Sequence, residues 1–267
     1  MSSRHGVLPR LKRRKIQEAV ESGKRMDGRG LEDYREITIR TNVIEKAEGS
    51  AEVHLGETRV LVGVKIGHGR PFEDTPDVGV LICNAEFVPI ASPLFEPGPP
   101  KENSIELARV VDRGLRSAEV VDFSKLALIP GRQVYLIHVD LYILNHAGNL
   151  IDASAIAAIA ALRSAMKPVY KVEEGEVVLT DEKEPLEIRK MPVAVTMVKI
   201  EDSLILDPSA DEEEVMDARL TVTLDDDGNI CTIQKSGSKG LTLDEIGKAI
   251  DIAVKKAPDI RGKITGS

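Results

Sequence analysis

The sequence predicts an α+β protein made of two similar halves behind a basic N-terminal helix. Segments with strand periodicity alternate with segments of helical periodicity, and the order strands, hairpin, helix occurs twice. The chain has 267 residues, 42% hydrophobic and 30% charged, which suits a soluble protein with a substantial core. Since no long Pro/Gly linker separates the halves, we expect one compact unit over 25–267, with halves of approximately 25–170 and 171–267.

The N-terminal segment, residues 1–24, is predicted to be a basic amphipathic helix over 8–22 that ends at Gly23. Its apolar side chains fall near one face, namely Leu11, Ile16, Ala19 and Val20. Residues 1–30 carry nine Lys/Arg and three acids, whereas the whole chain has a formal net charge of −8. Because an acidic surface repels nucleic acid, RNA or DNA binding would require a local basic patch.

Strand and helix signals of the first half follow in a regular order. Strands are predicted from Glu36 onward, and then in a hairpin over 50–66 that turns at Gly56 and Glu57. A loop over 67–79 leads to a strand over 80–90. After the proline-rich stretch 92–100, the pattern predicts a helix over 102–121, and a long strand follows over 132–144.

The second half begins after an alanine-rich helix predicted over 153–166, with Asp152 as its N-cap. Residues 171–190 are predicted to form a charged loop with a short strand at Val177–Leu179. The remaining elements are two strands, a hairpin and a closing helix, predicted over 192–200, 203–208, 219–234 and 242–257.

Several classes of protein are excluded by what the sequence lacks. It has no apolar run near the ~18 residues that span a bilayer and no apolar secretory signal at its N-terminus. Cys83 and Cys231 lie far apart, which favours a reducing compartment. No metal-spaced histidine pair or nucleotide-binding motif is present, and His138 and His146 are interpreted as structural. We therefore expect a cytoplasmic protein without membrane contact, metal or cofactor.

Three arginines form a stripe on the helix predicted over 102–121. Arg109, Arg113 and Arg116 have the spacing i, i+4, i+7, and the opposite face is apolar through Leu107, Val110, Val111 and Leu115. Guanidinium groups bind phosphate oxygens in a fork and stay charged at physiological pH. The pattern alone favours a solvated face paired with Glu106 and Asp112, and a phosphate-binding surface is the alternative.

Two acidic stretches and a glycine-rich one allow more than one interpretation. The acidic segment 207–220 could supply acid/base carboxylates or a magnesium site, but we favour a solvated turn. The segment 225–229 lacks the spacing of a calcium loop and is predicted to be a hairpin turn. Residues 67–70 are predicted to form a flexible turn, since no helix follows to present amides to a phosphate.

Four blocks, in order along the chain, resemble the RNase PH family. They are RMDGRGLEDYREI from Arg25, EGSAEVHLGETRVLVGVKI from Glu48, ENSIELARVVDRGLR from Glu102 and LNHAGNLIDASAIAAIAAL from Leu144. The basic helix before the first block and the AGNLIDAS variant resemble, within that family, the non-catalytic RNase PH-like subunits of the archaeal exosome. The resemblance implies an RNase PH-like fold of two similar α+β halves.

Active members of this family cleave RNA from its 3′ end with inorganic phosphate, and the resemblance locates their motifs here. Their Gln-Ala-Asp-Gly-Gly motif matches 145–149, where Ala147 stands in place of the aspartate. Their two aspartates, six residues apart, match Glu213 and Arg219. A guanidinium cannot act as a general acid at neutral pH. The resemblance therefore implies a subunit that is not itself an enzyme.

The same resemblance implies partners and contacts. Arg109, Arg113 and Arg116 match the family helix that lines the RNA path, and Arg132 lies near the family's phosphate-binding arginine in sequence. The expected partners are a catalytic RNase PH-like paralogue, with three heterodimers forming a hexameric ring, an RNA-binding cap subunit and RNA. Two alternatives stay open: an active phosphorolytic exoribonuclease using Glu213 and Asp217, and a structural module without RNA contact.

Overall fold

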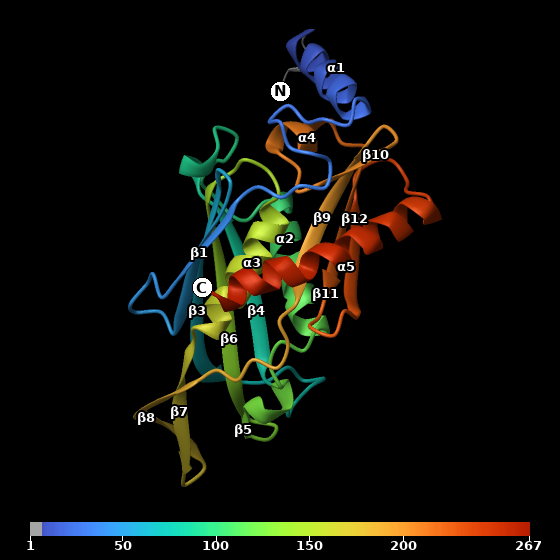
Figure 1. Ribbon diagram of the computed structural model, residues 1–267. Coiled ribbons are helices and arrows are strands. Elements are labelled where there is room, and N and C mark those ends of the chain that lie inside the picture. Colours follow the sequence, from blue (N-terminus) through green and yellow to red (C-terminus); the bar gives the residue numbers. More distant parts are fainter. Residues whose placement is uncertain (1–6) are drawn as a thin grey trace.

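Two β-sheets enclose a pair of helices in the computed structural model, which describes residues 7–267, with side chains from residue 12 onward (Figure 1). The larger sheet has the strand order β1-β2-β3-β6-β4, with β5 paired to β6, and the second sheet has the order β10-β9-β11-β12. This mixed arrangement of two sheet-and-helix halves behind an N-terminal helix confirms the predicted fold class.

The larger sheet is built from the strands of the first half. Its members are β1 (Ile37–Thr41), β2 (Gly49–Leu55), β3 (Thr58–Gly69), β4 (Val80–Phe87), β5 (Ala127–Ile129) and β6 (Gln133–Asn145). The hairpin between β2 and β3 turns at Gly56, as predicted, with φ +54. Side chains alternate between faces along β6, so that Ile137, Val139 and Leu141 are buried against the helices.

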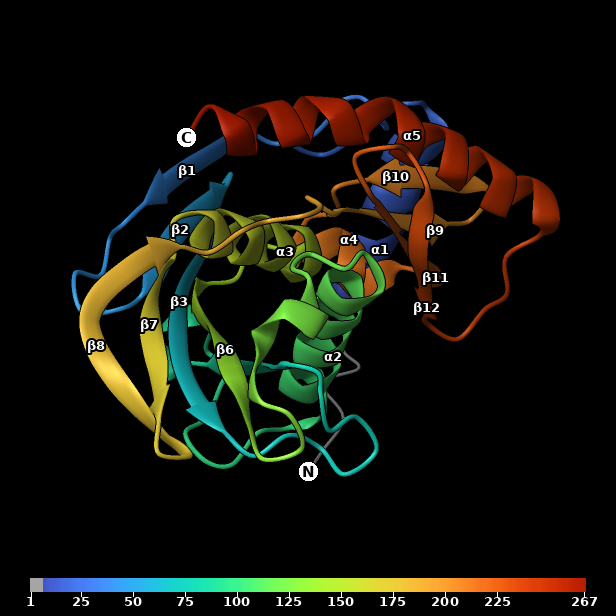
Figure 2. The ribbon, with the colours of Figure 1, turned by 90° about the horizontal axis from the view of Figure 1, so that it is seen from below.

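Helices α2 (Glu102–Ser117) and α3 (Leu150–Arg163) cover the inner face of this sheet (Figure 2). Helix α3 is buried almost all round, and it contacts β2 and β3 of one sheet and β9 of the other. Its alanines allow this close approach. A Cβ at Gly49 would lie 2.3 Å from the carbonyl oxygen of Ala161, so β2 needs glycine there.

The second half repeats the arrangement of sheet and helix. Its elements are β9 (Val193–Ile200), β10 (Ser203–Leu206), α4 (Ala210–Val215), β11 (Ala218–Leu224), β12 (Ile230–Ser236) and α5 (Leu243–Thr265). The predicted turn between β11 and β12 is confirmed: the carboxylate of Asp225 accepts hydrogen bonds from the backbone of Asp227 and Asn229, and Gly228 has φ +80.

The basic helix predicted at the N-terminus is α1 (Val7–Glu21). It packs on the second half, where Ile16 and Val20 are buried against Val198, Ile200 and Ile205. Its cations contact acids of the segment after β10, because Lys12 pairs with Asp211 and Arg13 lies 3.5 Å from Asp217. Much of the positive charge that the sequence concentrates here therefore meets negative charge within the same chain.

The predicted charged loop over 171–190 is wrong for most of its length, although the short strand predicted at Val177–Leu179 is confirmed as part of a longer strand. Residues Met166–Glu173 (β7) and Glu176–Pro185 (β8) form an antiparallel hairpin that pairs with itself. The turn residues Glu174 and Gly175 both have positive φ, +50 and +84, which is the geometry that two-residue hairpin turns need. The high density of charge concealed the alternation Tyr-Lys-Val-Glu over 170–173, before this turn.

The acidic segment after β10 is not the solvated turn that we favoured. It forms the short helix α4, which Ser209 and Glu212 close at its N-terminus by a reciprocal capping box. Three of the segment's carboxylates are buried, those of Asp207, Glu212 and Asp217. Buried carboxylates need cationic or hydrogen-bonding partners, and cationic or amide side chains from other parts of the chain supply them.

Smaller corrections concern the ends of elements. Asn149, not Asp152, is the N-cap of α3, and Gly67–Gly69 continues β3 instead of forming a flexible turn. Helix α2 ends at Ser117, four residues before the predicted end. Helix α5 passes Pro258 and continues to Thr265, because Ile260 and Ile264 stay buried against the core beyond the proline.

No helix in residues 7–267 is long and apolar enough to cross a membrane. Across the same residues, no group of three or more His, Cys, Asp or Glu side chains has an arrangement that could hold a metal ion.

Candidate functional site

Arginines of the first sequence block hold the acidic segment in place. Arg35 binds Asp207 through two nitrogens, at 2.9 and 2.7 Å, and Arg29 donates to the same carboxylate at 2.9 Å. Arg25 forms a buried ion pair with Glu212 and donates to backbone carbonyls at 2.8 and 2.9 Å. The guanidinium groups of Arg25, Arg29 and Arg35 are thus all paired with carboxylates of this chain. The block from Arg25 to Arg35 therefore has a structural role.

The turn over 145–149 lies directly against the segment 207–210. The backbone N–H of Ala210 donates to the carbonyl of Ala147 at 3.0 Å. Gly148 has φ +99, and a Cβ there would lie 2.4 Å from the backbone of Pro208 and Ala210. The structure thus brings together the two segments that the sequence matches to the active site of the RNase PH family.

Glu213 is the one carboxylate that remains among the matched positions. It accepts a hydrogen bond from the backbone N–H of Asn149 at 3.0 Å. Burial raises the pKa of Glu213 to about 7, although this hydrogen bond and the nearby cations Arg219 and Arg35 act against the shift. A carboxyl of this kind changes its charge near neutral pH.

Arg219, at the second matched position, does not approach the turn as a catalytic group would. Its guanidinium donates to the carboxylate of Glu106 on α2 at 2.7 Å. Asp217 is also occupied, since Lys239 lies at 3.0 Å and Arg13 at 3.5 Å from its carboxylate. Glu213 and Asp217 therefore have separate partners and do not form the pair that an active enzyme of this sequence would use.

Asp152 has a role that the sequence did not reveal. Its buried carboxylate accepts hydrogen bonds from the hydroxyls of Tyr34 and Thr196, both at 2.6 Å, and from the side chain of Asn149 at 2.8 Å. Burial raises the pKa of Asp152 to about 6, against the effect of these donors. The carboxylate ties α3, β9 and the first block together and is shielded from solvent.

The arginine stripe lies where the sequence predicted it, but its members differ. The apolar face of α2 is buried, and Arg109 and Arg113 line an open cavity of about 340 Å³ together with Gln234 of β12. Arg116 instead binds Asp112 at 2.9 Å and the carbonyl of Leu81. The structure therefore leaves Arg109 and Arg113 available to a ligand and engages Arg116 in the fold.

The acid Glu106, on the same helix, links this cavity to Arg219 of β11. Glu106 also lines the cavity, but Arg219 neutralises it through their ion pair. This ion pair offsets the negative charge of Glu106 beside Arg109 and Arg113. Sequence reasoning assigned Glu106 to the stripe itself and so missed this link between α2 and β11.

Arg132 lies far from the matched positions. It precedes β6, at the opposite end of that strand from Asn145, and 13 residues at about 3.3 Å each make a separation of roughly 40 Å. There it lines a separate cavity of about 510 Å³ with Arg70 and Phe72.

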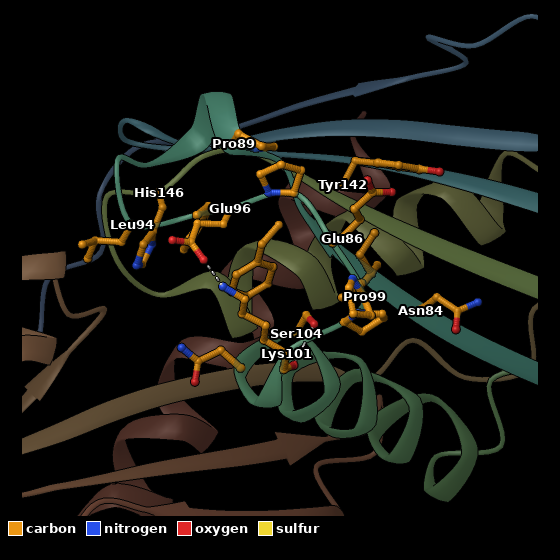
Figure 3. A pocket seen from close by; sticks show the side chains of 18 of the residues that line it. Asn84, Glu86, Pro89, Leu94, Glu96, Pro99, Lys101, Ser104, Tyr142 and His146 are labelled. Atoms are coloured by element: carbon orange, nitrogen blue, oxygen red, sulfur yellow. Dashed lines mark hydrogen bonds and ion pairs between the residues drawn. The ribbon is translucent and has the colours of Figure 1, made fainter. Parts of the chain in front are cut away.

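A larger cavity, of about 600 Å³, lies between the proline-rich loop and the strands β4 and β6 (Figure 3). Lys101 and Glu96 form an ion pair of 2.7 Å beside it, and His146 reaches it from the matched turn. The ring of His146 stacks on Phe95 with centroids 5.7 Å apart. Burial lowers the pKa of His146, as does Arg35, so this histidine packs as a neutral ring.

The fold and the paired segments define a class of protein. The chain belongs to the 3′ exoribonuclease, or RNase PH, family: the model of the family's domain 1 matches residues 33–168, and the model of its domain 2 matches residues 190–256.

Among its relatives are several archaeal proteins named exosome complex component Rrp42. The chain is 52% identical to that of Thermococcus onnurineus over 260 residues, which is 97% of this chain and 96% of the relative. It is 44% identical to that of Methanothermobacter thermautotrophicus over 261 residues, again 97% of this chain and 96% of the relative.

Solved structures give the same result. A chain of the Archaeoglobus fulgidus exosome with RNA bound to the active site superimposes with a TM-score of 0.89 at 46% identity, covering 97% of this chain and 99% of that one. A chain of an archaeal exosome core has a TM-score of 0.85 at 42% identity, covering 97% and 98%. The resemblance to an RNase PH-like subunit of the archaeal exosome therefore rests on close relatives over nearly the whole chain.

Proposed function

We propose that this chain is a non-catalytic subunit of a cytoplasmic exosome that degrades RNA phosphorolytically from the 3′ end. Its relatives carry the name of an exosome component, and one similar structure is an exosome with RNA bound. The chain would complete the active site of a catalytic RNase PH-like paralogue and hold RNA phosphates. Three such heterodimers would form a hexameric ring, to which an RNA-binding cap subunit adds.

One observation carries the non-catalytic assignment. At the position of the second family aspartate the chain has Arg219, and its guanidinium is bound to Glu106 at 2.7 Å. A guanidinium cannot deliver a proton at neutral pH, and Ala147 offers no carboxylate at the aspartate position of the family's Gln-Ala-Asp-Gly-Gly motif. Of the three matched positions, only Glu213 keeps a carboxylate. The charges that the chain does present nearby, Arg109 and Arg113, are suited to binding phosphate.

Reconstitution tests the assignment. The purified chain should not shorten RNA in the presence of phosphate and magnesium, and addition of the catalytic paralogue should produce phosphate-dependent shortening. The mixture should run as one species near six chains in size-exclusion chromatography. A Glu213→Gln variant of the chain should support the paralogue's activity as the wild type does, if Glu213 has no catalytic role.

The two alternatives give different results in the same experiment. Phosphate-dependent shortening by the chain alone, abolished in the Glu213→Gln variant, would identify an active exoribonuclease. A complex that assembles and degrades RNA equally well with Arg109 and Arg113 changed to Glu would identify a structural module without RNA contact.

A further inference from the structure

Arg219 connects the strand β11 to the helix that carries the arginine stripe. The side chains of Arg219, Thr221 and Thr223 alternate with those of their neighbours along β11 and so share one face of the second sheet. That face meets α2, because a Cβ at Gly114 would lie 3.5 Å from the methyl group of Thr223. From the same face, the guanidinium of Arg219 donates to the carboxylate of Glu106 at 2.7 Å.

Glu106 is also well placed to pair with Arg109. The two residues are three apart on α2, and side chains at this spacing are neighbours on a helix surface and attract each other when their charges are opposite. The side chain of Glu106 is 39% exposed, which leaves room for it to turn toward Arg109. Glu102 lines the same cavity, but it lies seven residues before Arg109, two turns away.

The structure shows Glu106 engaged with β11 instead. Among the side chains described from residue 12 onward, Glu106 pairs with Arg219, and Arg109 forms no ion pair. Arg116, on the same helix, gives the contrast, since Asp112 lies four residues before it and the two side chains pair at 2.9 Å. Asp112 thus binds an arginine of its own helix, whereas Glu106 binds an arginine of another element.

We propose that Arg219 is a positioning residue for RNA binding: it holds Glu106 on the side of β11 and so leaves Arg109 and Arg113 free for phosphate oxygens. This role rests on the proposed function, because it concerns the surface that would contact RNA. Without a cation at position 219, Glu106 would pair with Arg109 and place a negative charge beside the phosphates. The residue at the position of a family aspartate would then act on the binding surface and not on the reacting bond.

Two substitutions in the complex with the paralogue test this role. Arg219→Gln keeps a hydrogen-bond donor for Glu106 but removes the cation, and it should weaken RNA binding about fivefold at low salt. Glu106→Gln added to Arg219→Gln removes the released acid and should restore affinity to within about twofold of the wild type. In RNA degradation, Arg219→Gln alone should raise KM for RNA and leave kcat unchanged, because the chemistry belongs to the catalytic paralogue.

A third substitution distinguishes a contact from a general change of charge. In an Arg109→Gln background, the released Glu106 has no arginine three residues further along the helix to pair with. Arg219→Gln should therefore change RNA affinity by less than about twofold in this background. An effect of net charge alone would persist there at about fivefold.

Lys199→Gln is the matched control. Lys199 of β9 pairs with Glu245 of α5, and its side chain is 16% exposed, close to the 17% of Arg219. It should leave RNA affinity within about twofold of the wild type. Thermal unfolding of each assembled complex checks that a loss of affinity is not a loss of fold.

The pH of the binding measurements removes a second carboxyl group from the comparison. Burial raises the pKa of Glu213 to about 7, and Arg219 acts against this shift. Removing Arg219 should therefore raise the pKa of Glu213 further. At about pH 6, Glu213 is then mostly protonated in every variant, and Glu106 is the acid whose charge the substitutions release.

The outcomes separate this role from the proposed function. If the wild-type chain forms no RNA-binding complex with the paralogue, or if changing Arg109 and Arg113 to Glu leaves RNA binding unaltered, the RNA contact and this role of Arg219 both fail. If that change weakens binding but Arg219→Gln does not, the contact stands and the role of Arg219 is overturned. A loss that Glu106→Gln does not restore, or one that persists in the Arg109→Gln background, would also overturn it.

Discussion

The arginines of the first block and the arginines of α2 are chemically identical but stand in opposite surroundings. Arg25 and Arg35 are sequestered, each bound to a carboxylate that is itself buried. Arg109 and Arg113 stand on an exposed helix face beside a cavity that Glu102 and Glu106 also line, and Glu106 is paired with Arg219. Around the matched turn, paired charge stabilises the fold, whereas the RNA contact that we propose would use the unpaired charge of Arg109 and Arg113 on α2.

A substitution at Asp207 tests most directly whether paired charge stabilises the fold around the matched turn. Its carboxylate accepts hydrogen bonds from Arg29, Arg35 and Asn149. Asp207→Asn therefore leaves Arg35 without its counter-charge in a buried site, and Arg29 keeps only Asp27. Asparagine tolerates the positive φ of this position, +49, so backbone strain does not confound the change. The free energy of unfolding should fall by about 3–5 kcal/mol, measured by denaturant unfolding.

The matched control for that variant is Asp211→Asn. Asp211 also pairs with a cation, Lys12, but its side chain is 60% exposed. Its loss should cost less than about 1 kcal/mol. Equal effects of the two substitutions would show that the first block is held by packing and not by its charges.

A smaller effect is expected at Glu213, and it depends on pH. The pKa of Glu213 is raised by burial, from 4.5 to about 7, so its folded-state protonation is favoured. A raised pKa contributes stability that is complete below pH 4.5 and is lost as pH rises through about 7. Glu213→Gln removes this loss and keeps an acceptor for the N–H of Asn149. The variant should therefore be more stable than wild type at pH 8, by at most about 3 kcal/mol.

The gain should shrink as the pH is lowered toward 4.5, and unfolding midpoints of the two proteins across this range measure it. Glu214→Gln is the control, because Glu214 is the exposed neighbour on the same helix. A wild-type protein that is as stable as the Gln variant at pH 8 would place the Glu213 carboxylate in contact with solvent or a cation.

Much of this architecture could be predicted because it depends on local sequence patterns. The periodicity of α2 locates both its buried face and its arginines, and Gly56 and Gly228 mark turns. The partners of Asp207 and Asp152 could not be predicted. Their donors come from segments up to 178 residues away, as from Arg29 to Asp207, and only the folded chain brings them together. The acidic segment 207–220 was for that reason misjudged as solvated.

The β7–β8 hairpin was not predicted, for a different reason. Its alternation and its Glu174-Gly175 turn are local signals, but acids and lysines dominate the composition of the segment, and a charged stretch is typical of a loop. The hairpin also lacks a buried face within the chain, so hydrophobicity does not mark it.

The smallest expected effect concerns the arginines of α2 and tests whether they bind RNA phosphates. RNA held by phosphates loses affinity with salt, and each lost contact on a single strand lowers the slope of log affinity against log salt by about 0.7. Changing Arg109 and Arg113 to Glu in the assembled complex should therefore flatten the slope by about 1.4 and weaken binding of every RNA sequence alike. Arg116→Glu should lower the slope less, since its guanidinium already holds Asp112 and the carbonyl of Leu81. Arg40→Glu, at an exposed arginine on β1, is the control and should leave the slope unchanged. Filter binding at several salt concentrations measures all four proteins, and an unchanged slope in the double variant would make the stripe a solvated helix face, no different in function from any other charged surface of the molecule.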